Sequence, residues 1–186
     1  MKTYLSARKT FYSVALLLAG VFWIWFSRLP ISAGFQTSIE APQNGFQAPG
    51  FTLSTLEGKE LDLEDLRGNP IILNFWASWC PPCRAEMPDF QQTYQEFQET
   101  DLQIIAINAT DQDSLKGMMA FVNQHNLKFP IILDSTGETS QAYHVHSLPT
   151  SYFIDREGRI KDIIVGGPIP LSLLRIQAIQ LIEGNQ

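Results

Sequence analysis

Both cysteines of this 186-residue chain lie in one short motif, Cys80-Pro81-Pro82-Cys83, and the segments on its two sides differ sharply in character. Residues 71–76 (IILNFW), just before it, form a nearly continuous apolar run, which is typical of a β-strand covered on both faces. Residues 81–99 have a helical composition, with aromatic side chains at spacings of three and four. The motif therefore marks a junction between a buried strand and a helix, which severely restricts the folds available to the chain.

The position of the motif at the start of a helix has a chemical consequence. Cys80 falls near the N-cap, where free backbone N–H groups and the positive end of the helix dipole favour the thiolate and lower the thiol pKa. Pro81 occupies the first helical position, where a missing N–H costs little. We expect the N–H of Cys83 to be the first donor that reaches the Cys80 sulfur. Cys80 is predicted to attack a substrate disulfide, and the more buried Cys83 to resolve the mixed disulfide.

Three other uses of the cysteine pair stay open on these residues alone. A structural disulfide would close a ring so small that it constrains the unfolded chain little. A metal site would need ligands besides the two cysteines, and the chain offers only His125, His144 and His146. The third alternative is an inert pair of buried thiols.

Strand-like and helix-like segments alternate through the rest of the body. Apolar runs predict further buried strands at 102–109 and 129–133, and helical periodicity predicts helices at 114–126 and 171–182. Turn residues between short strand-like runs predict two hairpins, at 51–63 and 151–165. This order predicts an α/β fold with a mixed sheet and helices on both of its faces.

Charge divides the chain into two parts. The first 34 residues carry four basic residues and no acidic one, a net charge of +4, whereas the remainder has nine basic and 19 acidic residues, a net charge of −10. An acidic body argues against nucleic-acid binding, which needs basic surface to neutralise phosphates.

Residues 11–26 (FYSVALLLAGVFWIWF) are free of charge and follow three bases, which predicts a transmembrane anchor with its N-terminus in the cytoplasm. The run exceeds the core of a signal peptide but is shorter than a full span of ~20 residues, so a cleaved signal stays an alternative. We assign residues 1–31 to the cytoplasmic tip and signal-anchor, 32–47 to a linker rich in Gly, Pro and Gln, and 48–186 to the folded domain.

The segment 75–88 (FWASWCPPCRAEMP) resembles the active-site region of the thioredoxin superfamily, and in particular the membrane-anchored thiol–disulfide oxidoreductases of the TlpA/ResA type. The likeness spans residues 48–182 and includes Gly58-Lys59, the stretch 65–68 and Leu148-Pro149-Thr150. It implies a thioredoxin-like fold and a redox-active Cys80–Cys83 disulfide that needs no dissociable cofactor and no metal. It also implies a single-pass protein of the bacterial cytoplasmic membrane, with its catalytic domain on the extracytoplasmic side.

The resemblance further implies that Glu86 is catalytic. Glu86 lies three positions after Cys83, on the same helical face, and could take and return the proton of the resolving thiol. Burial would raise its pKa toward a useful range, while a solvated surface acid is the alternative. Asn74 stands where cytoplasmic thioredoxins place a buried Asp, and an amide cannot carry the proton.

Substrate contacts are implied near the motif and at a distant proline. The resemblance implies a cis peptide bond between Leu148 and Pro149, where the Leu148 backbone can pair with an extended substrate segment. A trans loop proline is the alternative. Trp79 and Pro81 are expected to contact a docked partner beside Cys80, whereas Trp76 is expected in the core.

These expectations combine into a specialised reductant. Thiols outside the cytoplasm tend to oxidise, so the protein would draw electrons from a membrane thiol-reductant donor and reduce disulfides in exported proteins. The resemblance implies the C-x-x-C-H haem-attachment site of apocytochrome c as substrate, and other exported disulfide proteins are the alternative. Two further classes stay open, a copper metallochaperone that uses Cys80, Cys83 and His146, and a docking domain with silent cysteines.

Overall fold

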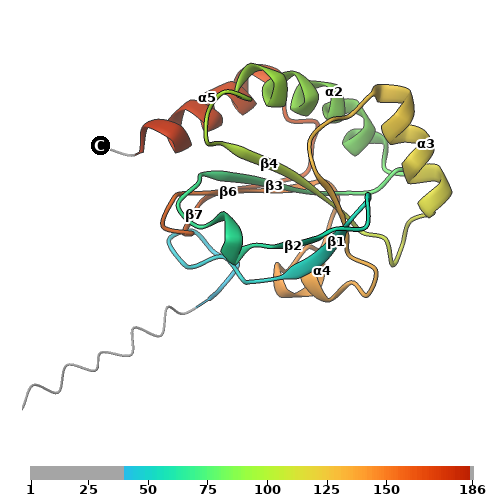
Figure 1. Ribbon diagram of the computed structural model, residues 1–186, viewed down its shortest axis with the longest axis horizontal. Helices are drawn as coiled ribbons and strands as arrows, with labels where there is room; N and C mark the ends of the chain where they lie inside the picture. The colour runs from blue at the N-terminus through green and yellow to red at the C-terminus, as the bar shows by residue number, and fades with distance from the viewer. Residues whose placement is uncertain (1–39, 185–186) are drawn as a thin grey trace, which may run out of the picture. The chain divides into compact units, whose positions relative to one another are not determined.

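The computed structural model describes residues 40–184, so the anchor predicted at 1–31 and most of the predicted linker lie outside the described residues. Within them a seven-stranded sheet has the order β2-β1-β5-β4-β3-β6-β7 (Figure 1). The strands are β1 (Thr52–Thr55), β2 (Glu60–Asp62), β3 (Ile71–Trp76), β4 (Gln103–Asn108), β5 (Ile131–Leu133), β6 (Thr150–Ile154) and β7 (Ile160–Val165). The helices are the 3₁₀ turn η1 (Glu64–Leu66), α2 (Pro81–Glu96), α3 (Leu115–His125), α4 (Glu138–Ala142) and α5 (Leu171–Glu183). Among residues 40–184 no helix combines the length and the apolar character needed to cross a bilayer.

The sheet is mixed, and the pairing of its strands brings three connecting segments to one end of the sheet. Strands β3, β4 and β5 run parallel, while β6 is antiparallel to β3. Trp76 is aligned with Asn108, and Phe75 with Thr150. The residues that follow β3 and β4 therefore lie at the same end of the sheet as the residues that precede β6.

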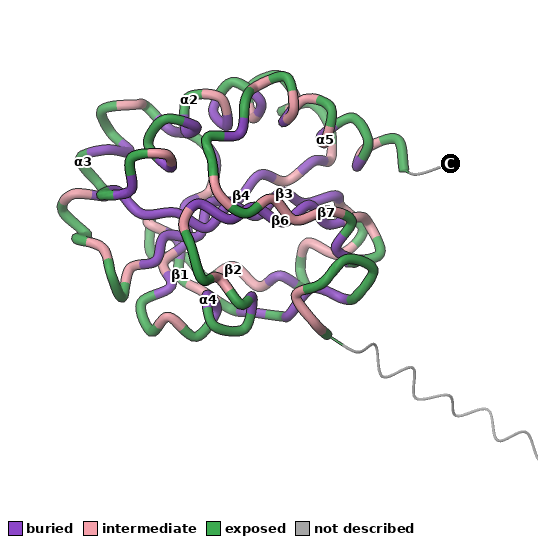
Figure 2. Tube along the Cα trace, turned by 180° about the vertical axis from the view of Figure 1, so that it is seen from behind, coloured by how far each residue is buried: buried purple, intermediate pink, exposed green. Residues whose placement is uncertain are grey.

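Side chains alternate along β3 between two apolar cores, which is why this strand is buried at all six positions. Ile72 and Trp76 belong to the core formed with α2, α3 and α5, which contains Met87, Phe121 and Leu174. These three helices lie on one side of the sheet in Figure 1. Figure 2 shows the buried strands between the exposed outer segments.

The second core fills the opposite face of the sheet. It contains Leu73 and Phe75 from β3 together with Tyr143, which follows α4, and Leu63, which precedes η1. Helices thus cover both faces, and the predicted α/β fold with a mixed sheet is confirmed.

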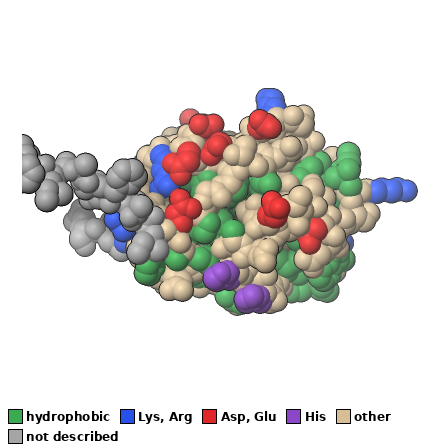
Figure 3. All heavy atoms as spheres, turned by 90° about the horizontal axis from the view of Figure 1, so that it is seen from below, with side chains coloured by type: hydrophobic (Ala, Val, Ile, Leu, Met, Phe, Trp, Pro, Cys, Tyr) green, Lys and Arg blue, Asp and Glu red, His purple; other side chains and the backbone are tan. Residues whose placement is uncertain are grey.

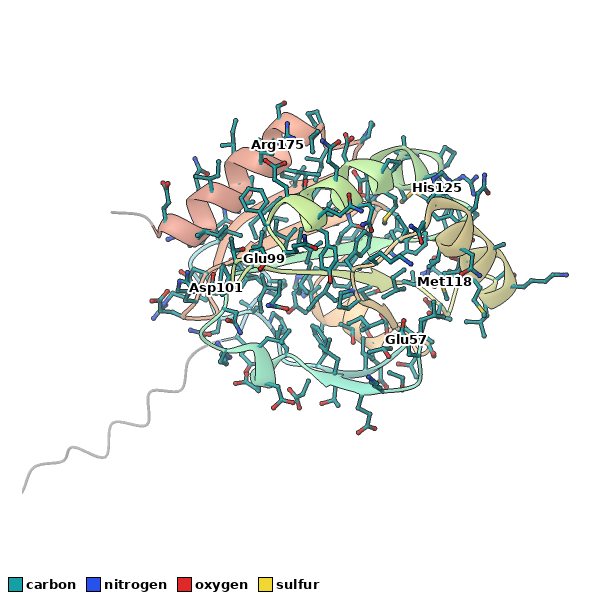
Figure 4. The ribbon with its side chains drawn as sticks, turned by 45° about the horizontal axis from the view of Figure 1, so that its top comes forward. Glu57, Glu99, Asp101, Met118, His125 and Arg175 are labelled. Carbon is teal, nitrogen blue, oxygen red and sulfur yellow. A yellow bond between two sulfur atoms is a disulfide. The ribbon has the colours of Figure 1, made fainter. Side chains whose placement is uncertain are left out.

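Local differences from the sequence prediction have physical reasons. Helix α4 was not predicted, because its five residues (ETSQA) show no apolar periodicity. It forms because the buried carboxylate of Asp134 accepts hydrogen bonds from the backbone N–H groups of Thr139 (3.4 Å) and Ser140 (2.7 Å). The third predicted strand shortens to β5, and α2 ends at Glu96. The Glu96 carboxylate pairs at 2.7 Å with Arg175 of α5, which Figure 4 labels.

The described part of the predicted linker makes backbone hydrogen bonds with the domain. The N–H of Gly45 donates to the carbonyl of Ile160 at 2.7 Å, and the N–H of Ile160 donates to the carbonyl of Phe46 at 2.9 Å. The N–H of Ala48 donates to Gly158 at 3.0 Å. The boundary placed at residue 48 therefore falls inside a hydrogen-bonded segment.

Candidate active site

Cys80 and Cys83 form a disulfide at the N-terminus of α2. Cys80 is the N-cap residue, and its sulfur accepts the N–H of Cys83 at 3.3 Å, as the sequence predicted. The prolines at the first two helical positions have no N–H to offer. Cys83 is fully buried and Cys80 is 3% exposed, so a thiolate at either position would depend on the helix start for its stabilisation.

Glu86 lies one turn further along α2 and is completely buried. Burial is the main reason why its pKa is raised from 4.5 to about 7. Two donors oppose this effect, the N–H of Ile169 at 2.9 Å and Nδ2 of Asn74 at 2.8 Å, while the charge of Asp89 adds to it. A carboxyl group with this pKa can both hold and release a proton near neutral pH.

Asn74 connects Glu86 to the next strand. Its Nδ2 also donates to the hydroxyl oxygen of Ser151 on β6 at 2.9 Å. The amide at this position therefore serves as a hydrogen-bond donor that supports the ionised form of Glu86.

The peptide bond between Leu148 and Pro149 is cis, as the resemblance implied, and a second cis bond joins Gly167 to Pro168. The N–H of Gly166 donates to the carbonyl of Pro149 at 2.8 Å, which holds the two turns together. Sequence reasoning missed Gly167 and the backbone of Ile169 as parts of the site. The available signal was the Gly166-Gly167-Pro168 run directly after the last strand.

Gly167 permits the close approach of this turn to Glu86 and Pro149. A Cβ atom at position 167 would lie 2.6 Å from Glu86 Oε2 and 2.6 Å from Pro149 Cγ, and both neighbours are buried. We expect Gly167→Ala to lower the free energy of unfolding by about 1–3 kcal/mol through overpacking. Urea unfolding measures this change, and Gly50→Ala is the control, because a Cβ at Gly50 meets no atom within 4 Å. Equal stability of the two variants would contradict the packing shown for Gly167.

Two of the four predicted substrate contacts, Trp79 and Leu148, line a small cavity of about 140 Å³ together with residues that include Gln112 and His146. The Trp79 side chain is 56% exposed, and its Nε1–H donates to the carbonyl of Gln112 at 3.0 Å. Leu148 also packs against the core that contains both cysteines. The structure therefore brings Trp79 and Leu148 together.

The other predicted positions lie apart from this cavity. Pro81 is exposed at the start of α2. Trp76 is fully buried against Phe121, with ring centroids 5.6 Å apart, so its expected place in the core is confirmed.

The histidines show no ligand set around the cysteines. The rings of His144 and His146 stack with centroids 6.4 Å apart, and both residues are exposed. His125 lies on α3 with the buried Met118 (Figure 4) and packs against Phe121. Within residues 40–184 no three side chains of His, Cys, Asp or Glu come together as metal ligands. Acidic side chains are spread over the face in Figure 3, while Lys and Arg lie toward its margins.

A cysteine pair that opens a helix after a buried strand of a mixed sheet, with a cis-proline directly before the neighbouring strand, is the arrangement of thioredoxin-fold thiol–disulfide oxidoreductases. Comparison with known proteins agrees with this class. The chain belongs to the AhpC/TSA family, whose sequence profile matches residues 45–163.

Named relatives narrow the assignment further. The chain is 41% identical over 133 residues to "Thiol-disulfide oxidoreductase ResA" of Bacillus thuringiensis (strain Al Hakam), covering 72% of this chain and 76% of the relative. A putative thiol:disulfide interchange protein DsbE from Chlorobium tepidum superimposes with a TM-score of 0.68 at 32% identity, covering 75% of this chain and 98% of that one. StoA from Bacillus subtilis gives a TM-score of 0.62 at 32% identity, covering 69% and 96%. The predicted relationship to ResA-type proteins is confirmed, and the protein is a thiol–disulfide oxidoreductase.

Proposed function

We propose that this oxidoreductase is held at the bacterial cytoplasmic membrane by its N-terminal segment and reduces disulfides of exported proteins on the outer side. The uncharged run 11–26 and the +4 charge of the first 34 residues support the anchor and its orientation. The observation that carries the chemistry is the buried cysteine pair with a fully buried carboxyl group one turn away on α2.

The reduced protein would act in two steps. The Cys80 thiolate attacks one sulfur of the substrate disulfide, so that a Cys80–substrate bond forms and the other substrate sulfur leaves as a thiolate and takes up a proton. Cys83 then gives its proton to Glu86 and attacks the Cys80 sulfur, which releases the second substrate thiolate. Two electrons pass to the substrate, and the Cys80–Cys83 disulfide is reduced again by a membrane thiol donor.

Glu86 suits the second step because its pKa of about 7 lies near the pH at which it would work. A carboxylate held by the N–H groups of Asn74 and Ile169 can accept the proton of Cys83, and burial makes the neutral acid readily formed. The proton then returns to the leaving substrate thiolate.

Trp79, Pro81, Leu148 and Pro149 would hold the substrate. Trp79 and Pro81 present exposed apolar surface on either side of Cys80. The Leu148 backbone, before the cis bond to Pro149, would pair with an extended substrate segment. Such pairing suits an unfolded chain that displays its cysteines.

An apocytochrome c with an oxidised C-x-x-C-H site is the substrate we propose, supported by the 41% identity to a protein named ResA and by the resemblance of segment 75–88. Other exported disulfide proteins are the competing substrates within the same chemistry. The alternative of a copper carrier takes His146 as a third ligand, and within residues 40–184 no three side chains of His, Cys, Asp or Glu come together as metal ligands.

Trapping by Cys83→Ser tests this proposal in bacteria that produce c-type cytochromes. Without the resolving thiol, the Cys80–substrate disulfide is expected to accumulate on the full chain, and mass spectrometry of the adducts should identify apocytochrome c. The double variant Cys80→Ser/Cys83→Ser is the control and should trap nothing. Adducts with other exported proteins alone would overturn the haem-pathway assignment, and adducts with cytosolic proteins would overturn the membrane orientation.

A further inference from the structure

The loop between β4 and α3 contains Asp113, whose carboxylate binds Ser78, the residue two positions before Cys80. One carboxylate oxygen of Asp113, Oδ2, accepts the N–H of Ser78 at 2.6 Å and Nδ2 of Asn108 at 2.8 Å. The other, Oδ1, accepts the hydroxyl of Ser78 at 2.6 Å and the N–H of Ser114 at 2.7 Å. A single side chain thus ties the active-site loop to the end of β4 and the start of α3.

Further contacts join the same two segments. Nη1 of Arg84 donates to the carbonyl of Ser78 at 3.1 Å, and its guanidinium lies 4.6 Å from the ring centroid of Phe121 on α3. The first turn of α3 lies directly against the loop, because a Cβ at Gly117 would be 3.2 Å from Ser78 Oγ. The backbone N–H, the carbonyl and the hydroxyl of Ser78 are therefore all hydrogen-bonded.

This fixed loop determines the orientation of Trp79, the next residue. The Trp79 side chain is 56% exposed, yet its indole N–H is bound to the carbonyl of Gln112, which adjoins Asp113. An exposed aromatic ring that is held in one orientation can contact a partner with little further loss of side-chain entropy. It adjoins Cys80 and lines the cavity with His146 and Leu148.

We propose that Asp113 is a positioning residue for substrate selection: by fixing Ser78 it holds Trp79 beside Cys80, so that polypeptide disulfides react in preference to small ones. The inference rests on the proposed function in one respect, the role of Trp79 as a substrate contact. The Asp113 carboxylate binds Ser78, Asn108 and Ser114 and neither sulfur, so we expect its replacement to change the intrinsic reactivity of Cys80 little.

Two probes with the same leaving group test this selectivity on the full chain carrying Cys83→Ser. One probe is the thionitrobenzoate mixed disulfide of free cysteine, and the other is the same mixed disulfide on an unfolded polypeptide with a single cysteine. Release of thionitrobenzoate measures the rate at which Cys80 attacks each probe. Asp113→Asn turns one accepting oxygen into a donor that faces two other donors. Asp111→Asn removes the same charge from an exposed neighbour whose carboxylate, among residues 40–184, accepts only Nε2 of Gln112 at 3.2 Å.

We expect Asp113→Asn to slow the polypeptide probe about tenfold, the factor that corresponds to one lost hydrogen bond to a charged group. The cysteine probe should change by less than about twofold, and Asp111→Asn should alter neither rate. Equal losses on both probes, or no loss on the polypeptide, would overturn the proposal. If Asp113→Asn does not fold, Ser78→Ala removes one of the four hydrogen bonds and must show the same preference for slowing the polypeptide probe.

Trp79→Ala separates this inference from the function on which it rests. Slower attack on the polypeptide by Trp79→Ala but not by Asp113→Asn would overturn the role of Asp113 alone. An unchanged polypeptide rate in Trp79→Ala would remove Trp79 as a substrate contact, and with it both the selection mechanism and that part of the proposed function.

Discussion

Replacing Cys80 by serine is expected to abolish disulfide reduction, with a loss of at least about a thousandfold in kcat/KM, because a serine hydroxyl does not ionise near neutral pH and forms no disulfide. Cys83→Ser should behave differently, since Cys80 keeps its place at the start of α2 and can still attack. Its first step should persist while turnover stops at the mixed disulfide. Initial rates with a protein disulfide, measured beside single-turnover attack, distinguish the two variants.

Retained turnover in Cys80→Ser would contradict the catalytic assignment. Intact biological activity of Cys80→Ser in cells, without disulfide reduction, would favour the alternative of a docking domain with silent cysteines. Unfolding midpoints of the variants, compared with that of the oxidised wild type, give the structural control, because a small ring of this kind stabilises the fold only weakly. Loss of activity with little loss of stability is therefore the expected pattern.

We expect Glu86 to make the free energy of unfolding fall as the pH rises from about 4 to about 8. Its pKa rises from 4.5 to about 7 on folding, chiefly through burial, so the folded state keeps a proton that the unfolded state releases between these values. The free energy of unfolding contributed by this group is full below the lower value and is lost as the pH rises through the higher one. The pKa difference corresponds to a loss of about 3 kcal/mol.

Glu86→Gln is neutral at every pH, so it should lack this loss. The free energy of unfolding of the variant, minus that of the wild type, is expected to increase by about 3 kcal/mol between pH about 4 and about 8. Urea unfolding of the oxidised proteins measures this difference without interference from free thiols. Glu99→Gln, an exposed acid beyond the end of α2 (Figure 4), is the matched control. A difference that stays constant with pH would show that Glu86 titrates as an ordinary carboxyl group.

The sequence predicts best the parts of this fold that depend on neighbouring residues. Strand β3 reads as an apolar run because both faces are covered, and Cys80 reads as an N-cap because two prolines and a helical pattern follow it. Glu86 was expected to be partly buried through its spacing from Cys83. Its complete burial depends on segments that local spacing does not reveal.

The missed parts of the site are contacts between distant segments. Ile169 donates its N–H to Glu86 across 83 positions, and Asp113 accepts from Ser78 across 35. No periodicity links such residues, because they meet only when the strands pair in register. Every residue except proline has a backbone N–H, so the residue type does not reveal which N–H donates to Glu86. Gly167 can be read from the sequence, but the reason why this position requires glycine appears only in the fold, where a Cβ would clash with Glu86 and Pro149.

The attachment of residues 45–48 to the turn after β6 has a mechanical consequence. A pull on the chain before residue 40 would reach the domain through residues 41–48, whose backbone hydrogen bonds join Ala41 to Gln47, Gly45 to Ile160 and Ala48 to Gly158. The Gln47 side chain adds a further bond by accepting from Arg67 at 2.5 Å. Strand β6 separates this fastening from Pro149, and its five residues extend about 17 Å. If the segment before residue 40 tethers the domain, as we propose, force on that tether would enter the domain at these contacts, one strand length from the cis-proline turn at Pro149.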